Sequence, residues 1–258
     1  MRSEPAFTAP SNILQVWRKF DSFPMETLTK AWFLKKSPQT KQRSVPEMLE
    51  HRNRYGATGN CFDLSIWLIE EFRAAGVHAY GIGHGLGTIK AHVAVVALDS
   101  EGRRYLCDLG DLWIQPMLID AESAPVKQKG FFAGAEISFT QQGNKLDLIY
   151  DRPSGKQSRQ HCDLSPVPNK EFFDYGNFSQ ANLSRPLVEM RLFEADETKH
   201  WEYEEGRSFI SSMRGLEEQP ACGSTEEWGG RISGVTNMQA NYVRECLDAF
   251  QELNAHRS

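Results

Sequence analysis

The sequence predicts an α+β protein, and three changes of pattern along the chain carry that prediction. Apolar residues recur at helical spacing before residue 76, short apolar runs separated by turn residues follow, and strands mix with helices in the last hundred residues. These patterns predict an N-terminal helical bundle over 1–76, a central antiparallel β-barrel or sheet over 77–153, and a C-terminal α/β region over 154–258.

Helices in the first region follow from the spacing of apolar side chains. Spacings of three and four continue from Ser11 to about Glu50, with a break at Pro24. A helix is expected from Val45, because a proline in the next position suits a first helical turn. The following helix is expected to begin at Cys61 and to end near Gly76, with apolar residues over most of its surface.

A hairpin is the clearest strand signal in the second region. The apolar runs 91–98 and 103–109 flank a short segment that ends in Gly102, where a positive φ is tolerated. If paired positions sum to about 200, His92 lies opposite Asp108 or one position from it. The sequence therefore predicts that these two side chains are neighbours.

The later elements are less regular. Strands are expected over 187–193, 201–203 and 208–210, and an amphipathic helix over 242–253. The stretch 219–234 is rich in Gly, Glu and Ser and is expected to be a loop. Three aromatic residues are expected in the core, with one of them facing an acceptor pocket: Trp113, Phe131 and Phe132.

Composition excludes several classes of partner. The chain has 258 residues and a net charge of −5, and its Lys and Arg residues are scattered. This argues against nucleic acid, which requires a concentrated cationic face. No stretch of about 18 apolar residues could span a bilayer, and Met1–Ala6 lacks the apolar core of a signal peptide. We therefore expect a cytoplasmic protein that binds neither nucleic acid nor membranes.

The number and spacing of the cysteines predict that they are free thiols. They are five in number, widely spaced, and contain no Cys-x-x-Cys pair, which disfavours both a disulfide framework and a metal site in a reducing compartment. Four of them behave as small hydrophobes: Cys107, Cys162, Cys222 and Cys246. Cys61 differs, because a helix start favours thiolate over thiol.

Cys61, His92 and Asp108 together predict an activated nucleophile. Taken singly they would more often be a structural cysteine, a core histidine and a turn cap. In combination, the imidazole can hold the thiol proton while the carboxylate fixes the imidazole tautomer. Their order and predicted proximity favour such a catalytic triad.

The segments around these residues resemble the arylamine N-acetyltransferase family, whose triad is like that of the cysteine proteases. Gly59-Asn60-Cys61-Phe62-Asp63 resembles the family motif Arg-Gly-Gly-x-Cys-x-Glu, Ala91-His92 resembles its Thr-His strand start, and Asp108-Leu109-Gly110 resembles its Asp-Val-Gly motif. Phe23–Leu28 and the segment from Asp163 to Asn177 resemble flanking stretches. The matches keep the family's order from about Val16 to Ile210.

The chain also departs from the family pattern. The motif arginine is Ala57 here, its first glycine is Thr58, and its glutamate is the shorter Asp63. Such an arginine and carboxylate normally form a charge-assisted pair, so Arg52 or Arg54 is expected to replace the missing guanidinium. Asp111 stands where the family has phenylalanine, which adds a charge beside the triad.

The resemblance implies acyl transfer through an acyl-Cys61 intermediate. No cofactor is held permanently; acetyl-coenzyme A or another acyl-coenzyme A is the co-substrate, and a small-molecule amine is the acceptor. Backbone N–H groups around Phe62 and the 108–110 turn are the expected oxyanion donors. Residues 81–87 are expected to form a mobile loop near the site, in which Gly83, Gly85 and Gly87 approach the donor. A ligand contact of His84 is the less favoured alternative.

Two other functions stay open. A transglutaminase-like, amide-forming or hydrolytic thiol enzyme would use the same triad with a different acyl donor. A non-catalytic binding module would retain the fold without turnover, which the changes at Ala57, Thr58, Asp63 and Asp111 allow. The acyl donor distinguishes the transglutaminase-like enzyme from the coenzyme A-dependent acyltransferase. An unreactive Cys61 would indicate the binding module.

Overall fold

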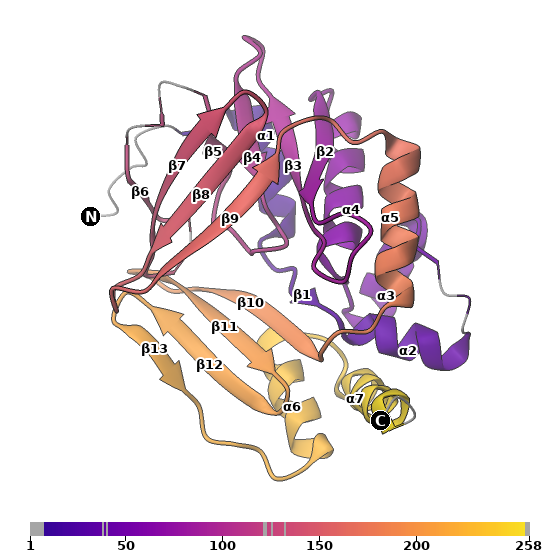
Figure 1. Ribbon diagram of the computed structural model, residues 1–258. Helices are drawn as coiled ribbons and strands as arrows, with labels where there is room; N and C mark the ends of the chain where they lie inside the picture. The colour runs from indigo at the N-terminus through magenta and orange to yellow at the C-terminus, as the bar shows by residue number, and fades with distance from the viewer. Residues whose placement is uncertain are drawn as a thin grey trace.

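The computed structural model describes residues 8–37, 39, 41–120, 123–124, 126–131 and 133–255, and it has the α+β architecture that the sequence predicts. N-terminal helices lie behind a curled eight-stranded sheet, and a second, five-stranded sheet lies below it with the C-terminal helices (Figure 1). Phe132 falls outside the described residues. None of the described helices combines the length and apolarity needed to cross a bilayer.

The N-terminal region contains α1 (Ser11–Trp17), a 3-10 turn η1 (Arg18–Phe20), α2 (Leu28–Lys36), α3 (Val45–Tyr55) and α4 (Cys61–Ala74). α4 begins at Cys61 as predicted, and Gly76 follows its end with a φ of 70°. Eight residues of α4 are buried, because it packs across the strands that carry the site. Burial on most sides explains why this helix is apolar nearly all round.

The eight-stranded sheet is antiparallel throughout and has the order β5-β4-β3-β2-β9-β8-β7-β6. Its strands are β2 (Ala79–His84), β3 (His92–Leu98), β4 (Arg104–Cys107), β5 (Met117–Leu118), β6 (Gln128–Lys129), β7 (Glu136–Gln142), β8 (Lys145–Asp151) and β9 (Gln157–Asp163). The sheet thus continues past residue 153. Residues 81–84, expected in a mobile loop, belong to β2, because each pairs with β3.

The β3–β4 hairpin has a register two positions from the expected one. Leu98 pairs with Arg104 and Val95 with Cys107, so paired positions sum to 202. Ladder pairing ends at Cys107, and the following residues turn towards His92. The proximity of His92 and Asp108 therefore depends on this turn as well as on the strands.

β9 lies beside β2 over a single pair, Gly83 with Asp163, and is otherwise paired with β8. The two strands diverge from that point (Figure 1). This opens the curled sheet next to β2 and β3, on the side that faces the second sheet.

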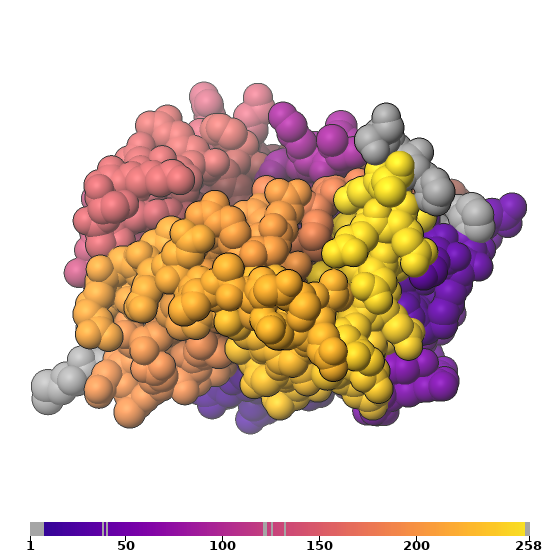
Figure 2. Space-filling model, turned by 90° about the horizontal axis from the view of Figure 1, so that it is seen from below, coloured from indigo at the N-terminus to yellow at the C-terminus, as the bar shows by residue number. Residues whose placement is uncertain are grey.

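The second sheet has the order β1-β10-β11-β12-β13 and is also antiparallel. Its strands are β1 (Met25–Glu26), β10 (Leu187–Phe193), β11 (Thr198–Glu204), β12 (Arg207–Ser212) and β13 (Gly215–Glu218), and α5 (Asn169–Ala181) precedes β10. These strands and the C-terminal helices form the underside of the molecule (Figure 2). β1 joins the N-terminal region to this sheet.

The expectation of a loop over 219–234 was wrong from residue 225 onward, because α6 (Thr225–Thr236) forms there and packs against α7 (Ala240–Ala255). Its glycines weaken helix propensity, but they also permit close packing: a Cβ on Gly229 would lie 2.6 Å from Arg244 Cγ. The core aromatics Trp113 and Phe131 are fully buried, as expected.

Candidate active site

Cys61 is the first residue of α4, and the cap of that helix fixes its position. The Asn60 side chain accepts hydrogen bonds from the N–H groups of Phe62 (2.9 Å) and Asp63 (3.3 Å). Asp63 in turn accepts the Asn60 N–H at 3.0 Å, which completes a capping box. Cys61 is half-buried and meets the positive end of the α4 dipole.

His92 and Asp108 form the second part of the site. His92 Nε2 lies 2.8 Å from Asp108 Oδ2, and the Asp108 side chain is 1 % exposed. Burial opposes a charge on His92, but the charges of Asp108 and Asp111, with hydrogen bonds to Asp108 and the Cys61 thiol, raise the pKa of His92 well above its ordinary value. Because Nε2 faces Asp108, Nδ1 is the ring nitrogen left for the thiol.

Gly110 lies where the three side chains converge. A Cβ placed on it would lie 2.7 Å from Cys61 Cβ, 2.7 Å from His92 Cε1 and 3.3 Å from Asp108 Oδ1. The first two distances are too short for any side chain. The structure thus brings Cys61, His92 and Asp108 together around one glycine.

Asp111 is a second carboxylate near the imidazole, 3.9 Å from His92 Nε2. Burial is the main cause that raises the pKa of Asp111 to about 6; the His92 charge opposes the rise, while Asp108 and Glu189 add to it. The Tyr150 hydroxyl donates to the Asp111 carboxylate at 3.3 Å. The extra charge foreseen from the sequence is therefore part of the site.

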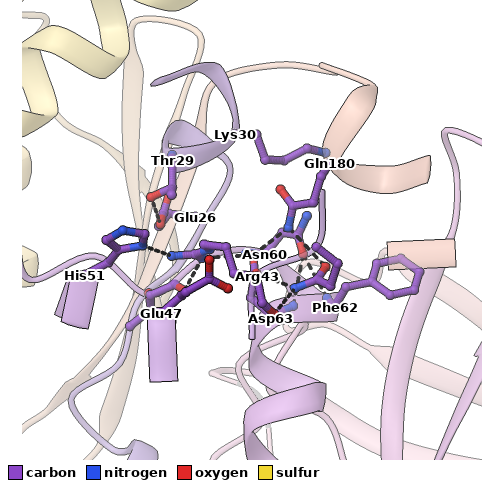
Figure 3. A network of polar contacts seen from close by, with 12 residues as sticks. Glu26, Thr29, Lys30, Arg43, Glu47, His51, Asn60, Phe62, Asp63 and Gln180 are labelled. Carbon is purple, nitrogen blue, oxygen red and sulfur yellow. Dashed lines mark hydrogen bonds and ion pairs between the residues drawn. The ribbon is translucent and has the colours of Figure 1, made fainter. Parts of the chain in front are cut away.

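A buried ion pair supports the start of α4 (Figure 3). Arg43 Nη2 lies 3.2 Å from Asp63 Oδ2 and donates to the Thr58 carbonyl at 2.7 Å, and the two charged side chains are 5 % and 1 % exposed. The expectation that Arg52 or Arg54 would fill this role was wrong. Arg52 donates to the carbonyls of Gly56 and Ser22, and Arg54 lies over the Tyr55 ring.

Amide side chains complete this network around Asp63. Gln42 donates to Oδ1 at 2.7 Å. Gln180, labelled in Figure 3, donates to Oδ2 at 3.0 Å. Gly59 is required beside them, because it has a φ of 123° and a Cβ there would lie 2.2 Å from Asp63 Oδ2. The segment before α3 and helix α5 are thereby tied to one carboxylate of α4, two residues after Cys61.

Sequence reasoning missed Arg43, Gln42 and Gln180. Each is far in sequence from Asp63, so no local pattern marks them. Asn60 did have a signal, since Asn followed three residues later by an acidic residue is a helix-start pattern. The Phe62 N–H, expected to stabilise an oxyanion, instead donates to Asn60.

A cavity of about 710 Å³ opens beside the triad, between the divergent end of β9 and the second sheet. His84, His92 and Asp111 line it on one side, and the His84 ring lies 5.6 Å from that of His92. Burial, and then the His92 charge, lower the pKa of His84, which favours its neutral form.

The three glycines expected to contact a donor do not line this cavity. Gly83 is buried in β2, where a Cβ would lie 2.8 Å from the His92 carbonyl oxygen. Gly85 and Gly87 lie in the turn after β2 with positive φ. Their role toward a donor stays a prediction.

Two groups of side chains could hold a metal ion among the described residues. His92, Asp108 and Asp111 form one, and Glu189, His200 and Glu202 form the other, each with ligand atoms within 4.8 Å of one another. The second group lies on the cavity wall across from the triad. The first group is already occupied with hydrogen bonds inside the site.

Comparison of the structure with solved structures gives one consistent result. An arylamine N-acetyltransferase from Mycobacterium marinum, solved in complex with CoA, superposes with a TM-score of 0.71 at 12 % identity over 94 % of this chain and 95 % of that chain. The fold is that of the arylamine N-acetyltransferases.

Two further enzymes with this fold support the same conclusion. The arylamine N-acetyltransferase of Salmonella typhimurium has a TM-score of 0.69 at 14 % identity, over 91 % of this chain and 89 % of that one. An arylamine N-acetyltransferase of Bacillus cereus, described as having a Cys-His-Glu catalytic triad, has a TM-score of 0.62 at 12 % identity, over 91 % of this chain and 93 % of that chain. No protein-family model and no curated protein sequence matches the chain.

Proposed function

We propose that this protein is an acyltransferase that moves an acetyl or other acyl group from a coenzyme A thioester to a small amine through an acyl-Cys61 intermediate. The observation that carries the proposal is the convergence of Cys61, His92 and Asp108 around Gly110, beside a cavity that His92 lines. The arylamine N-acetyltransferase fold, with one such enzyme solved in complex with CoA, supports the choice of donor.

The first half-reaction is acylation of the thiol. His92 accepts the Cys61 proton at Nδ1, and Asp108 stabilises the imidazolium through Nε2–H. The Cys61 sulfur then attacks the thioester carbonyl, a C–S bond forms, and the bond to coenzyme A sulfur breaks. The leaving thiolate takes the proton from His92, which balances the step.

The second half-reaction regenerates the thiol. An amine attacks the acyl-Cys61 carbonyl while neutral His92 accepts its proton, and the new C–N bond replaces the C–S bond; His92 then returns that proton to the Cys61 sulfur. The raised pKa of His92 makes it a stronger base for this step. Backbone N–H groups of the 108–110 turn remain the candidate donors to the tetrahedral oxyanion.

Intact-protein mass spectrometry after incubation with acetyl-coenzyme A tests the proposal. A single added acetyl group that is absent from Cys61→Ser, and that is removed by a panel of arylamines or hydrazines, would support it. Acylation by a small ester or a glutamine-like amide, but not by acetyl-coenzyme A, would favour the hydrolytic or transglutaminase-like alternative. If no donor acylates Cys61, the binding-module hypothesis should replace both.

A further inference from the structure

We propose that the donor lies along the free edge of β9 and that Arg159 and Lys156, with Arg152 beside them, bind its phosphates. This inference rests on the proposed function, because it names the place of the coenzyme A phosphates. All three cations line the cavity that contains His92. Their chemistry matches a polyanion, since guanidinium and ammonium groups are the usual partners of phosphate oxygens.

Two of these cations have no competing anionic partner. Among the residues that the structure describes, neither Lys156 nor Arg159 forms an ion pair, and the recorded side-chain contact of Arg159 is the Gln157 amide oxygen at 3.5 Å. Across the cavity, Arg185 is paired with Glu204 at 2.5 Å. The positive charge available to a ligand therefore lies mainly on the β8–β9 hairpin.

The β9 edge itself offers hydrogen-bonding groups for the rest of the donor. β9 pairs with β2 only through Asp163, so no strand among the described residues pairs with that edge over 157–162. An exposed strand edge binds extended chains through its N–H and C=O groups. The pantetheine arm of coenzyme A is an extended chain with two amide groups, which suits such an edge.

The length of β9 also agrees with the length of the pantetheine arm of coenzyme A. Asp163, the last residue of β9, pairs with Gly83, the neighbour of the His84–His92 pair, so the C-terminal end of β9 lies nearest the triad. At about 3.3 Å per residue, Arg159 lies roughly 13 Å along β9 from Asp163, and Lys156 roughly 23 Å. About thirteen bonds join the coenzyme A sulfur to its first phosphorus, which equals about four extended residues, or roughly 15 Å. A donor whose thioester end lies at Asp163 and whose arm follows β9 would therefore place its first phosphate near Arg159.

The charge of the opposite wall favours the same orientation. Glu189 and Glu202 on the second sheet line the facing side of the cavity, and Asp111 lines the side near the triad. Carboxylates repel phosphates, so a polyanionic donor is directed towards the hairpin. The cavity volume of about 710 Å³ is within the range of roughly 300–1,000 Å³ typical of ligand sites.

Binding and acylation measured separately test this assignment. The Lys156→Gln/Arg159→Gln variant is compared with Lys127→Gln/Lys170→Gln, which removes two exposed positive charges away from the cavity. Coenzyme A binding is measured by calorimetry at low and high salt. Acylation of Cys61 is followed by mass spectrometry with acetyl-coenzyme A and with S-acetylpantetheine, which has no phosphate.

We expect the hairpin variant to bind coenzyme A about tenfold more weakly and with less salt dependence, while its rate with S-acetylpantetheine equals that of the wild type. The assignment would be overturned if the control variant lost as much affinity for coenzyme A as the Lys156→Gln/Arg159→Gln variant. It would also be overturned if that variant lost acylation rate equally with both donors, or if the wild type did not bind coenzyme A. Failure of S-acetylpantetheine and acetyl-coenzyme A to acylate wild-type Cys61 would instead overturn the proposed function, and calorimetry would still decide whether the hairpin binds phosphates.

Discussion

Arg43 and Asp63 form a buried ion pair of 3.2 Å that connects the segment before α3 to the first turn of α4. The pair supplies, from a distant part of the chain, the guanidinium that the sequence lacks at Ala57. Since Asp63 also holds the Asn60 N–H, this pair supports the backbone that presents Cys61.

Replacement of Arg43 by Met should therefore destabilise the protein strongly. Removal of one partner of a buried ion pair leaves the other charge uncompensated, at a cost of about 3–5 kcal/mol. Chemical denaturation measures this cost, and Asp63→Asn in the same background should recover part of it. Arg54→Met is the control, with an expected change below about 0.5 kcal/mol. Equal stability of Arg43→Met and wild type would contradict the inferred role.

Gly110→Ala tests the convergence of the site. The added methyl group would lie 2.7 Å from both Cys61 Cβ and His92 Cε1, so the two side chains must separate. We expect acyl transfer to fall at least about 100-fold, as for small misplacements of catalytic groups, with about 1–3 kcal/mol of lost stability. Gly230→Ala, where no atom lies within 4 Å of the new Cβ, should leave acyl transfer unchanged. An active Gly110→Ala enzyme would show that this contact is not critical.

Thiol labelling separates Cys61 from the other cysteines. Burial raises the pKa of Cys162 to about 12 and also raises those of Cys107 and Cys246. Iodoacetamide at mildly acidic pH should therefore modify Cys61 first, as peptide mass spectrometry would show. Cys222 is the internal control, because it is half-buried like Cys61 but lines a different cavity, with Tyr203 and Trp228. Equal labelling of Cys222 and Cys61 would argue against an activated nucleophile.

Asp108→Asn should reduce acyl transfer by about 10³- to 10⁴-fold, as in other triads, because an amide can select the wrong imidazole tautomer and does not stabilise imidazolium. Single-turnover acylation of Cys61 measures the loss. Asp111→Asn should have a smaller effect, since Asp111 is 3.9 Å from the ring and Asp108 is 2.8 Å from it. A reversed order of the two variants would make Asp111 the orienting carboxylate.

The stability of Asp111→Asn relative to wild type should depend on pH. The pKa of Asp111 is raised to about 6 in the folded state, so its protonated form stabilises the wild type at low pH and this contribution is lost as the pH rises through 6. Asparagine does not titrate, and the variant should therefore gain about 1 kcal/mol relative to wild type between pH 4 and 7, after allowance for partial exposure. Thermal unfolding across this range measures the difference; a constant difference would refute the raised pKa.

Local patterns were sufficient for the elements that carry the candidate site. The start of α4 at Cys61 follows from its apolar stripe and cap, and the β3–β4 hairpin follows from two apolar runs around a glycine turn. α6 was missed because its glycines lower helix propensity, and packing against α7 compensates for that loss.

The sequence by itself determined which residues could form a reactive group, since Cys61, His92 and Asp108 lie in ordered motifs on short-range elements. Their roles in catalysis stay a prediction. Only the tertiary structure decided what supports and surrounds them: Arg43 as the partner of Asp63, Gly110 as the space between the side chains, and the cations of the β8–β9 hairpin in the same cavity. The physical reason is that such contacts join residues far apart in the chain, and no periodicity or local propensity records which distant residues will meet.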